Sequence, residues 1–299
     1  MAIDFSALEQ IGANLQRIVS GQNHVVAITE EGALYVWGRN DMGQLGLGVR
    51  NAEDTTLRFV PTLLELYNGN GQKQPVIDVA LGLEHTVAVV KGGRVFVWGS
   101  NRWGQLGIDQ DPDVVPWTSI PTPIDIGGES IRNVSSAGGH NAALTFGGAV
   151  YTWGANNEGQ LGQSGCIRED GIGNDPCLNY VKKPTKIFKT NENRFMPQMK
   201  LIAVGGHFAG EAADGSLVLD GGHTLAVTND NVLYGWGDNF HGQIGTFPRP
   251  GSRAPGPEDL DFFLPSLSAG GTKKFLVESE IPENQTSREF FLTRLTLNY

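Results

Sequence analysis

The fold of this chain is decided by residues 85–107, which read HTVAVVKGGRVFVWGSNRWGQLG. An apolar run that starts at His85 is followed by a glycine turn, and a second apolar run ends in Trp98-Gly99. Short apolar runs bounded by glycine are typical of β-strands. A tight turn bracketed by Gly104 and Gly107 follows. The stretch therefore predicts two strands of one hairpin with a glycine-bracketed turn after them.

The chain contains four copies of this stretch in the same internal register. In each copy a His is followed thirteen residues later by Trp-Gly, then by an Asn, and the copy closes with Gly-Gln-Leu-Gly or Gly-Gln-Ile-Gly. The repeated residues are His24, His85, His140 and His223; Trp37, Trp98, Trp153 and Trp236; and Asn40, Asn101, Asn156 and Asn239. Self-similarity of this kind predicts a repeat architecture.

Each copy offers four short apolar pieces: one before the His, one after it, one that runs into the Trp, and one around a Pro-Thr pair. Proline is tolerated on an edge strand and excluded from a central one, so the fourth piece is expected to be the outer strand. Four short antiparallel strands in each repeat describe a propeller blade. The sequence therefore predicts an all-β fold, a β-propeller of antiparallel four-stranded blades.

The repeats also predict the domain organisation. We expect residues 1–299 to form a single β-propeller domain with about five recognisable units, which begin near residues 17, 76, 131, 200 and 266. Insertions are expected at about residues 164–200 and 208–220. In the fifth unit Thr272 replaces the His, and no Trp-Gly follows it. A closed five-bladed ring and an incomplete seven-bladed arc are both compatible with this count.

Composition narrows the classes of partner. The formal net charge is −10, and phosphate contacts need clustered Lys and Arg, so no direct nucleic-acid binding is expected. No apolar run approaches the roughly eighteen residues of a membrane span, and no signal peptide is visible, so neither membrane insertion nor export is expected. A cytoplasmic or otherwise intracellular protein would keep Cys166 and Cys177 as free thiols; a disulfide between them is the alternative.

The repeated residues are expected to build the blades. A large aromatic at one fixed place fills the wedge between neighbouring sheets, which makes the four tryptophans core residues. The Gly after each Trp allows a left-handed turn or a close backbone approach, and the following Asn also suits such a turn. The Gln of each closing turn is expected to satisfy unpaired backbone groups. The four histidines would lie on different blades, so we expect buried imidazoles bonded to backbone and no metal site.

The sequence carries no strong catalytic motif. It has no nucleophile elbow, phosphate-binding glycine loop or zinc-ligand spacing, so neither an enzyme nor a cofactor is expected. The run Asp109-Gln110-Asp111-Pro112-Asp113 has the opening spacing of a calcium loop. Val114 stands where that loop needs Gly, and Ile120 stands in place of the closing Glu. A solvated acidic linker is the favoured interpretation.

The repeat His…Trp-Gly-x-Asn-x-x-Gly-Gln-Leu-Gly resembles that of the regulator of chromosome condensation family. The resemblance covers about residues 17–277 and implies a β-propeller, which in this family commonly has seven blades. Some members are guanine-nucleotide exchange factors for a small GTPase. The resemblance therefore implies a protein partner.

Function is expected where the copies differ. Between the Asn and the first Gly of each closing turn, two residues change from copy to copy, and we call these the rim pairs. The rim pairs are Asp41-Met42, Arg102-Trp103, Asn157-Glu158 and Phe240-His241. Exposed aromatic residues beside Arg or His are typical of interface anchors, which makes Arg102, Trp103, Phe240 and His241 the leading candidates. The alternative is that each side chain packs on a neighbouring loop.

The two insertions add charged candidates. Residues 208–220 carry Glu211, Asp214 and Asp220, and we expect a flexible acidic loop that suits a basic partner. The other insertion carries a basic run that would suit an acidic partner or form a solvated face. This basic run comprises Lys182, Lys183, Lys186, Lys189, Arg194 and Lys200.

These observations favour a non-enzymatic scaffold or assembly subunit that binds a protein through its variable rim loops. One alternative is a guanine-nucleotide exchange factor for a small GTPase, as the family resemblance implies. The other is a proteinaceous enzyme inhibitor that caps an enzyme with its rim loops.

Overall fold

The computed structural model describes residues 14–49, 58–163, 180–188, 195–211, 217–245 and 253–260. For residues 58, 207–211, 217–220 and 253–260 it describes the backbone alone. All of these residues belong to one compact unit, residues 1–262. The described part of the chain contains strands and no helix, and therefore no helix that could cross a bilayer.

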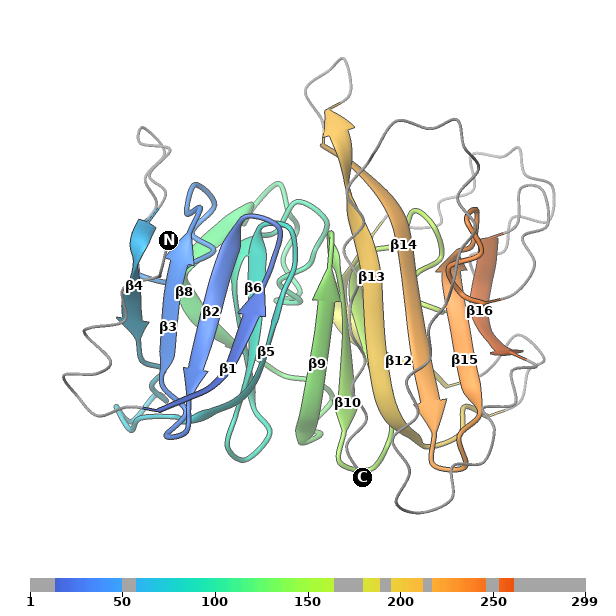
Figure 1. Ribbon diagram of the computed structural model, residues 1–299, viewed down its shortest axis with the longest axis horizontal. Helices are drawn as coiled ribbons and strands as arrows, with labels where there is room; N and C mark the ends of the chain where they lie inside the picture. Colours follow the sequence, from blue (N-terminus) through green and yellow to red (C-terminus); the bar gives the residue numbers. More distant parts are fainter. Residues whose placement is uncertain are drawn as a thin grey trace. The chain divides into compact units, whose positions relative to one another are not determined.

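Sixteen strands form four sheets of four strands each, with the strands of every sheet antiparallel and in sequence order (Figure 1). The first sheet contains β1 (Leu15–Ser20), β2 (His24–Thr29), β3 (Leu34–Gly38) and β4 (Arg58–Leu64). The second contains β5 (Val76–Leu81), β6 (His85–Val90), β7 (Val95–Ser100) and β8 (Trp117–Ile124). The third contains β9 (Ile131–Ala137), β10 (His140–Thr145), β11 (Val150–Ala155) and β12 (Tyr180–Lys186). The fourth contains β13 (Met199–Glu211), β14 (Leu217–Thr228), β15 (Leu233–Asp238) and β16 (Arg253–Leu260). The predicted all-β fold of four-stranded blades is confirmed. The fifth start, near residue 266, lies outside the described residues.

The Pro-Thr strands lie at a sheet edge, as their prolines predict. Pro61 lies in β4, Pro121 in β8 and Pro184 in β12, and each removes one backbone donor from its edge. The Thr after each of these prolines donates its hydroxyl to the carbonyl two residues before it. The three distances are 3.1 Å in β4, 2.9 Å in β8 and 3.0 Å in β12. Each of these edges thus loses a donor and has one carbonyl occupied.

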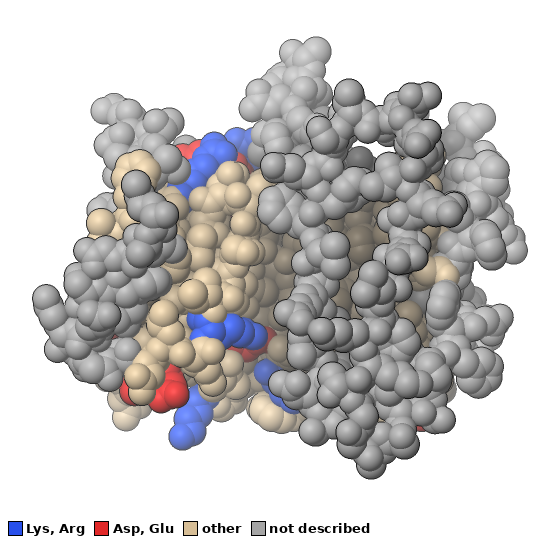
Figure 2. All heavy atoms as spheres, in the orientation of Figure 1, with Lys and Arg blue, Asp and Glu red and all other residues tan. Residues whose placement is uncertain are grey.

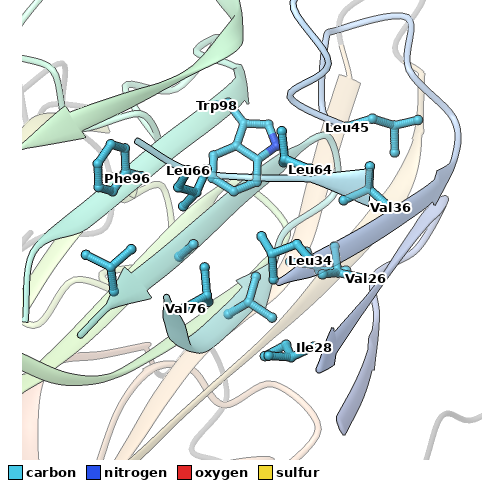
Figure 3. Packing of buried hydrophobic residues seen from close by; sticks show 14 residues of the cluster. Val26, Ile28, Leu34, Val36, Leu45, Leu64, Leu66, Val76, Phe96 and Trp98 are labelled. Carbon is cyan, nitrogen blue, oxygen red and sulfur yellow. The ribbon is translucent and has the colours of Figure 1, made fainter. Parts of the chain in front are cut away.

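Tryptophan fills the junctions between neighbouring sheets. Trp98 is fully buried, and Figure 3 shows it close to Leu64 and Leu66, which belong to the first sheet and the segment after it. Its indole Nε1 donates to the backbone carbonyl of Gln44 at 2.9 Å. Trp153 and Trp236 are also fully buried, whereas Trp37 of the first sheet is half-buried. Trp153 Nε1 likewise donates to the Gln105 carbonyl at 2.9 Å, whereas Trp236 Nε1 has no hydrogen-bond partner among the described residues. Two of the three buried indoles are therefore hydrogen-bonded to the blade before them.

A buried carboxylate joins the first strands of three sheets. Asp78 on β5 is 3 % exposed and forms an ion pair with Arg17 of β1. Its other oxygen accepts hydrogen bonds from Asn133 Nδ2 at 2.6 Å and from the Val134 amide at 2.8 Å, both on β9. Arg17, Asp78 and Asn133 each pair with the residue four positions after their blade's His, so they occupy equivalent places. The three sheets are therefore linked through one acceptor.

The fourth sheet departs from the other three in its first two strands. β13 has 13 residues and β14 has 12, against 5 to 8 for the other strands (Figure 1). Beyond Gly205, which pairs with His223, the two strands continue and end with Glu211 paired to Leu217. Residues 207–211 and 217–220 are thus paired strands and not the expected flexible loop. We call these two segments the hairpin arm; Asp214 lies outside the described residues.

Replacing Trp98 by alanine should lower the free energy of unfolding by about 3–5 kcal/mol, because it empties a fully buried aromatic site. It also leaves the Gln44 carbonyl without one of its donors. Urea unfolding followed by fluorescence or circular dichroism measures the loss. Phe146 supplies a control because it is 62 % exposed, so Phe146→Ala should stay within about 0.5 kcal/mol of wild type. Equal effects of the two substitutions would contradict the wedge role of Trp98.

Candidate interaction face

The turns that close each copy, residues 40–46, 101–107, 156–162 and 239–245, are braced by their own side chains, and we call them the rim turns. The Gln side-chain oxygen of each rim turn accepts the amide of the residue two positions before it, at 2.7–2.8 Å. The Asn side-chain oxygen accepts the amide of the Leu or Ile five positions on, at 3.0–3.2 Å. Asn and Gln thus brace every rim turn, and in two turns a rim-pair residue takes part, because the Gln44 and Gln160 side-chain amides donate to Asp41 and Asn157 at 3.0 Å.

Glycine and asparagine have different parts in these turns. Gly99 has a φ of 104°, and a Cβ there would lie 2.3 Å from the Glu84 carbonyl oxygen, so only glycine fits. None of the four repeat asparagines has a positive φ. The expectation that Asn adopts a left-handed turn is therefore wrong, and its contribution is the side-chain hydrogen bond described above.

The repeat histidines connect one blade to the next. His24 Nε2 lies 2.9 Å from the Thr86 hydroxyl, which donates its own hydrogen to the Gln44 carbonyl at 2.9 Å. Because the hydroxyl hydrogen is used in that way, His24 carries its proton on Nε2 and donates it to Thr86. Thr86 of the second blade is thus hydrogen-bonded to two residues of the first blade, His24 and Gln44.

The next junctions repeat this arrangement. His85 Nε2 lies 2.7 Å from Asn141 Oδ1, and the Asn141 amide donates to the Gln105 carbonyl at 2.9 Å. His140 Nε2 lies 3.3 Å from the Thr224 hydroxyl, which donates to the Gln160 carbonyl at 2.8 Å. These partners correct the expectation of imidazoles bonded to backbone, because each is a side chain of the following blade. His223 follows the expectation, with Nδ1 2.6 Å from the Gly221 carbonyl, and backbone hydrogen bonds also act on His140.

Burial keeps these imidazoles neutral. Desolvation lowers the pKa of His24 to about 3 and that of His85 to about 4. Desolvation, together with the nearby His223, lowers the pKa of His140 to about 3. The pKa of His223 is also lowered by burial. The histidines therefore act as neutral hydrogen-bond donors at physiological pH.

The four rim turns lie at the same end of their sheets. In every sheet the repeat His of the second strand pairs with the Gly that follows the Trp, so His and rim turn share one end. The links from each His to the next blade hold these ends side by side. We call the surface formed by the rim turns and the loops before each His the rim face.

The side chains of the rim pairs differ in exposure. Phe240 is 70 % exposed, and its ring meets that of exposed His241 edge to face at 5.0 Å. Arg102 and Asn157 are exposed. Asp41, Met42, Trp103 and Glu158 are half-buried. The four turns therefore present four different pairs of side chains on a common frame.

The structure adds two residues to the rim face that the sequence analysis missed. Arg39 follows Trp37-Gly38, and its guanidinium forms an ion pair with Asp41. Glu84 precedes His85, is 3 % exposed, and has its Oε1 at 3.9 Å from Arg39 Nη1. A comparison of copies would have shown both, because the residue before the His is Asn23, Glu84, Gly139 or Gly222, and the residue after Trp-Gly is Arg39, Ser100, Ala155 or Asp238.

The two carboxyl groups at this junction, Asp41 and Glu84, have pKa values that are shifted in opposite directions. Burial raises the pKa of Asp41, but hydrogen bonds from Gln44 and Arg39 outweigh it, so the pKa is lowered. Burial raises the pKa of Glu84, and the opposing attraction of Arg102 and Arg39 does not fully offset it. The Glu84 carboxylate is therefore held at an energetic cost.

Two of the six residues of the predicted basic run lie near acidic side chains of the same molecule. Lys183 lies 3.7 Å from Asp109, and Lys186 lies 3.9 Å from Glu129. Asp109 follows β7 and Glu129 follows β8, so both acids come from segments that precede β9. Lys186 also lies over the Phe188 ring at 5.6 Å. Where described atoms are visible in Figure 2, the blue Lys and Arg atoms form small groups and no broad basic area. Lys189 and Arg194 lie outside the described residues, as do Cys166 and Cys177.

The described residues contain no cluster of three potential metal ligands. Within the acidic linker, Asp109 pairs with Lys183, and Asp111 accepts the Asp113 amide at 3.0 Å. These contacts stabilise the conformation of the acidic linker.

A family model described as regulator of chromosome condensation (RCC1) repeat matches residues 31–89, 92–144 and 147–210, more than half of the chain. A second model with the same description matches residues 16–44, 76–105, 131–160 and 221–243. Together with four-stranded sheets joined through His, Trp and Gln, these matches define a β-propeller repeat protein. The chain belongs to the RCC1 repeat family.

Curated relatives are longer than this chain. The ultraviolet-B receptor UVR8 of Arabidopsis thaliana is 33 % identical over 235 residues, which cover 78 % of this chain and 43 % of the receptor. Protein RCC2 of Homo sapiens is 29 % identical over 244 residues, covering 78 % and 42 % respectively. The chain thus spans less than half the length of these relatives.

Solved structures support the fold. Prp20p of Saccharomyces cerevisiae superposes with a TM-score of 0.62 at 23 % identity, covering 83 % of this chain and 50 % of Prp20p. Human WBSCR16 superposes with a TM-score of 0.61 at 23 % identity, covering 83 % and 53 %.

Folding stability should fall as the pH drops below about 6.5, where histidines of the unfolded chain bind protons. In the folded chain His24, His85 and His140 stay neutral until the pH nears 3 to 4. Protons therefore favour the unfolded state, so stability is complete above about pH 6.5 and is lost toward pH 3. The slope is about 1.4 kcal/mol per pH unit for each histidine. Urea unfolding at a series of pH values measures it.

His85→Gln should reduce that slope by about 1.4 kcal/mol per pH unit, the contribution of one histidine, because it removes one buried titrating group. His241→Gln is the matched control, since solvent reaches this exposed side chain in both states. A slope that His85→Gln leaves unchanged would show that His85 is not held neutral by the fold.

Proposed function

We propose that this protein is a non-enzymatic scaffold that binds a protein partner through its rim face. One observation carries the proposal: the rim turns share the same internal bracing, yet every turn presents a different pair of side chains. The bracing shared by all four turns uses the Asn and Gln side chains and only the backbone amide of the rim pair. Variation on a fixed frame is what a recognition surface requires, because binding residues are typically carried by loops on a rigid scaffold.

The chemistry of the rim pairs supports the same proposal. Phe240 is largely exposed, and Arg102 stands beside half-buried Trp103. Aromatic residues and Arg dominate the binding energy of protein interfaces. Prp20p, a structural relative, was described with its binding properties to Gsp1p and histones, which are protein partners of that molecule.

The double substitution Trp103→Ala plus Phe240→Ala tests the proposal. We expect affinity capture followed by mass spectrometry to lose the principal partners of the wild-type protein, since two anchors are removed. Phe146→Ala plus Phe188→Ala is the matched control, because both rings are more than 60 % exposed and lie away from the rim turns. A partner set that the rim substitutions leave unchanged would remove the rim face from consideration.

A second candidate, a guanine-nucleotide exchange factor for a small GTPase, is favoured by the hairpin arm. β14 extends from His223 back to Leu217, and the His end of each sheet is its rim end. The arm therefore continues the fourth sheet on the side of the rim face. An element that protrudes beside a binding surface could reach into a nucleotide site of a bound partner.

Nucleotide release from a panel of small GTPases tests this second candidate. Micromolar protein should accelerate release from one of them. A variant in which an Asn-Gly turn replaces residues 208–219 should lose the acceleration, because two residues suffice to close a hairpin. No acceleration by the wild-type chain would exclude exchange activity while leaving the scaffold proposal intact.

A further inference from the structure

Three charged side chains of the rim face meet at the junction of the first two blades. Arg39 follows β3, Glu84 lies between β5 and β6, and Arg102 lies in the rim turn after β7. Glu84 Oε1 is 3.9 Å from Arg39 Nη1, and Arg102 acts on Glu84 through its charge. None of the three has a charged counterpart of the same sign at the equivalent place in another copy. The fold therefore does not require this group.

Glu84 is costly for the folded state. Its carboxylate is nearly inaccessible, and among the described residues its Oε2 has no hydrogen-bond partner. A buried carboxylate destabilises a fold unless it is paired and hydrogen-bonded. Residues that break such a rule commonly serve binding or catalysis. Arg39 lies 3.9 Å from the Glu84 carboxylate, and Arg102 attracts it through its charge, so both arginines offset part of this cost.

The accessible charge of this group is positive. Glu84 is buried, and Asp41 is already occupied by Arg39 and Gln44. Arg102 is exposed and makes no ion pair with any residue that the structure describes. A partner would therefore meet the Arg102 guanidinium with the half-buried Trp103 ring beside it.

We infer that the group Arg39, Glu84 and Arg102, with Trp103, is a recognition site for an acidic segment of a protein partner. A carboxylate of the partner pairs with Arg102, and an apolar neighbour packs on Trp103; this inference rests on the proposed function of the rim face. A nucleic acid fits less well, because two arginines in a chain of net charge −10 cannot neutralise a run of phosphates.

Glu84 sets the strength of this site. The groups that face it are Arg39, Asp41 and Arg102, and His85, the next residue, is neutral at the relevant pH. A negative Glu84 weakens the attraction between Arg102 and an acidic partner. Binding of an anion and protonation of Glu84 therefore favour one another. Affinity should rise as the pH falls toward the pKa of Glu84, which burial raises above its ordinary value.

Selection from a random twelve-residue peptide library on the full-length chain tests the inference. We expect the selected peptides to be rich in Asp and Glu and to carry an apolar residue. Arg102→Gln should weaken their binding about tenfold, as for a hot-spot ion pair. Lys91→Gln is the matched control and should change nothing, because exposed Lys91 lies in the β6–β7 turn at the opposite end of the sheet.

Glu84→Gln supplies a second readout. It should strengthen binding about threefold at pH 7 and abolish the dependence of affinity on pH between 7 and 5. A merely structural Glu84 would change neither quantity. A pH dependence that survives in Glu84→Gln would overturn the role assigned to this carboxylate.

The remaining outcomes separate this inference from the proposed function. Selected peptides that are neutral or basic, yet lose binding with Trp103→Ala, would overturn the acidic chemistry and leave the rim face as a docking surface. No selected peptide, or peptides indifferent to both Arg102→Gln and Trp103→Ala, would overturn the site itself. Binding of a twenty-nucleotide strand that Arg102→Gln abolishes would reassign it to nucleic acid.

Discussion

The described fold depends on one acceptor in each rim turn, the backbone carbonyl of its Gln. The Gln44 carbonyl accepts Trp98 Nε1 and the Thr86 hydroxyl, and the Gln105 carbonyl accepts Trp153 Nε1 and the Asn141 amide. These two carbonyls thus use both lone pairs on the following blade, whereas the Gln160 carbonyl accepts the Thr224 hydroxyl and Trp236 Nε1 has no hydrogen-bond partner among the described residues. The glycines and the side-chain hydrogen bonds of Asn and Gln hold the rim turn in the conformation that orients its Gln carbonyl toward the following blade. This explains why His, Trp, Gly, Asn and Gln recur together.

Much of this frame was predictable from residue spacing. The strands, their order and the edge position of the proline strands follow from periodicity and from what proline excludes. The hydrogen-bond partners of the histidines were not predictable in the same way. His85 bonds to Asn141, which is 56 residues away, and nothing in the spacing of one copy shows what faces it across a junction. The sequence indicated burial, and only the structure shows that the bond crosses between blades.

The candidate site was predictable to a smaller extent. Rim pairs stand out because they vary within a fixed motif, and this led to Arg102 and Trp103. Arg39 and Glu84 lie in different copies, so their meeting depends on how one blade packs against the next. The surroundings of the basic run also depend on how blades pack. Asp109 and Glu129, which balance Lys183 and Lys186, come from the preceding repeat and its linker.

The Pro-Thr edges restrict how other molecules can attach to the described blades. Pro61, Pro121 and Pro184 interrupt the row of donors, and the threonines occupy carbonyls that a visiting strand would need. At these three edges an incoming peptide therefore has fewer main-chain partners, which disfavours extension of the sheet, a mode that tolerates almost any sequence. Association then depends more on side chains, which differ from blade to blade. The Pro-Thr edges therefore contribute to selectivity together with the rim face, because they disfavour main-chain pairing, the least selective way of binding to a sheet.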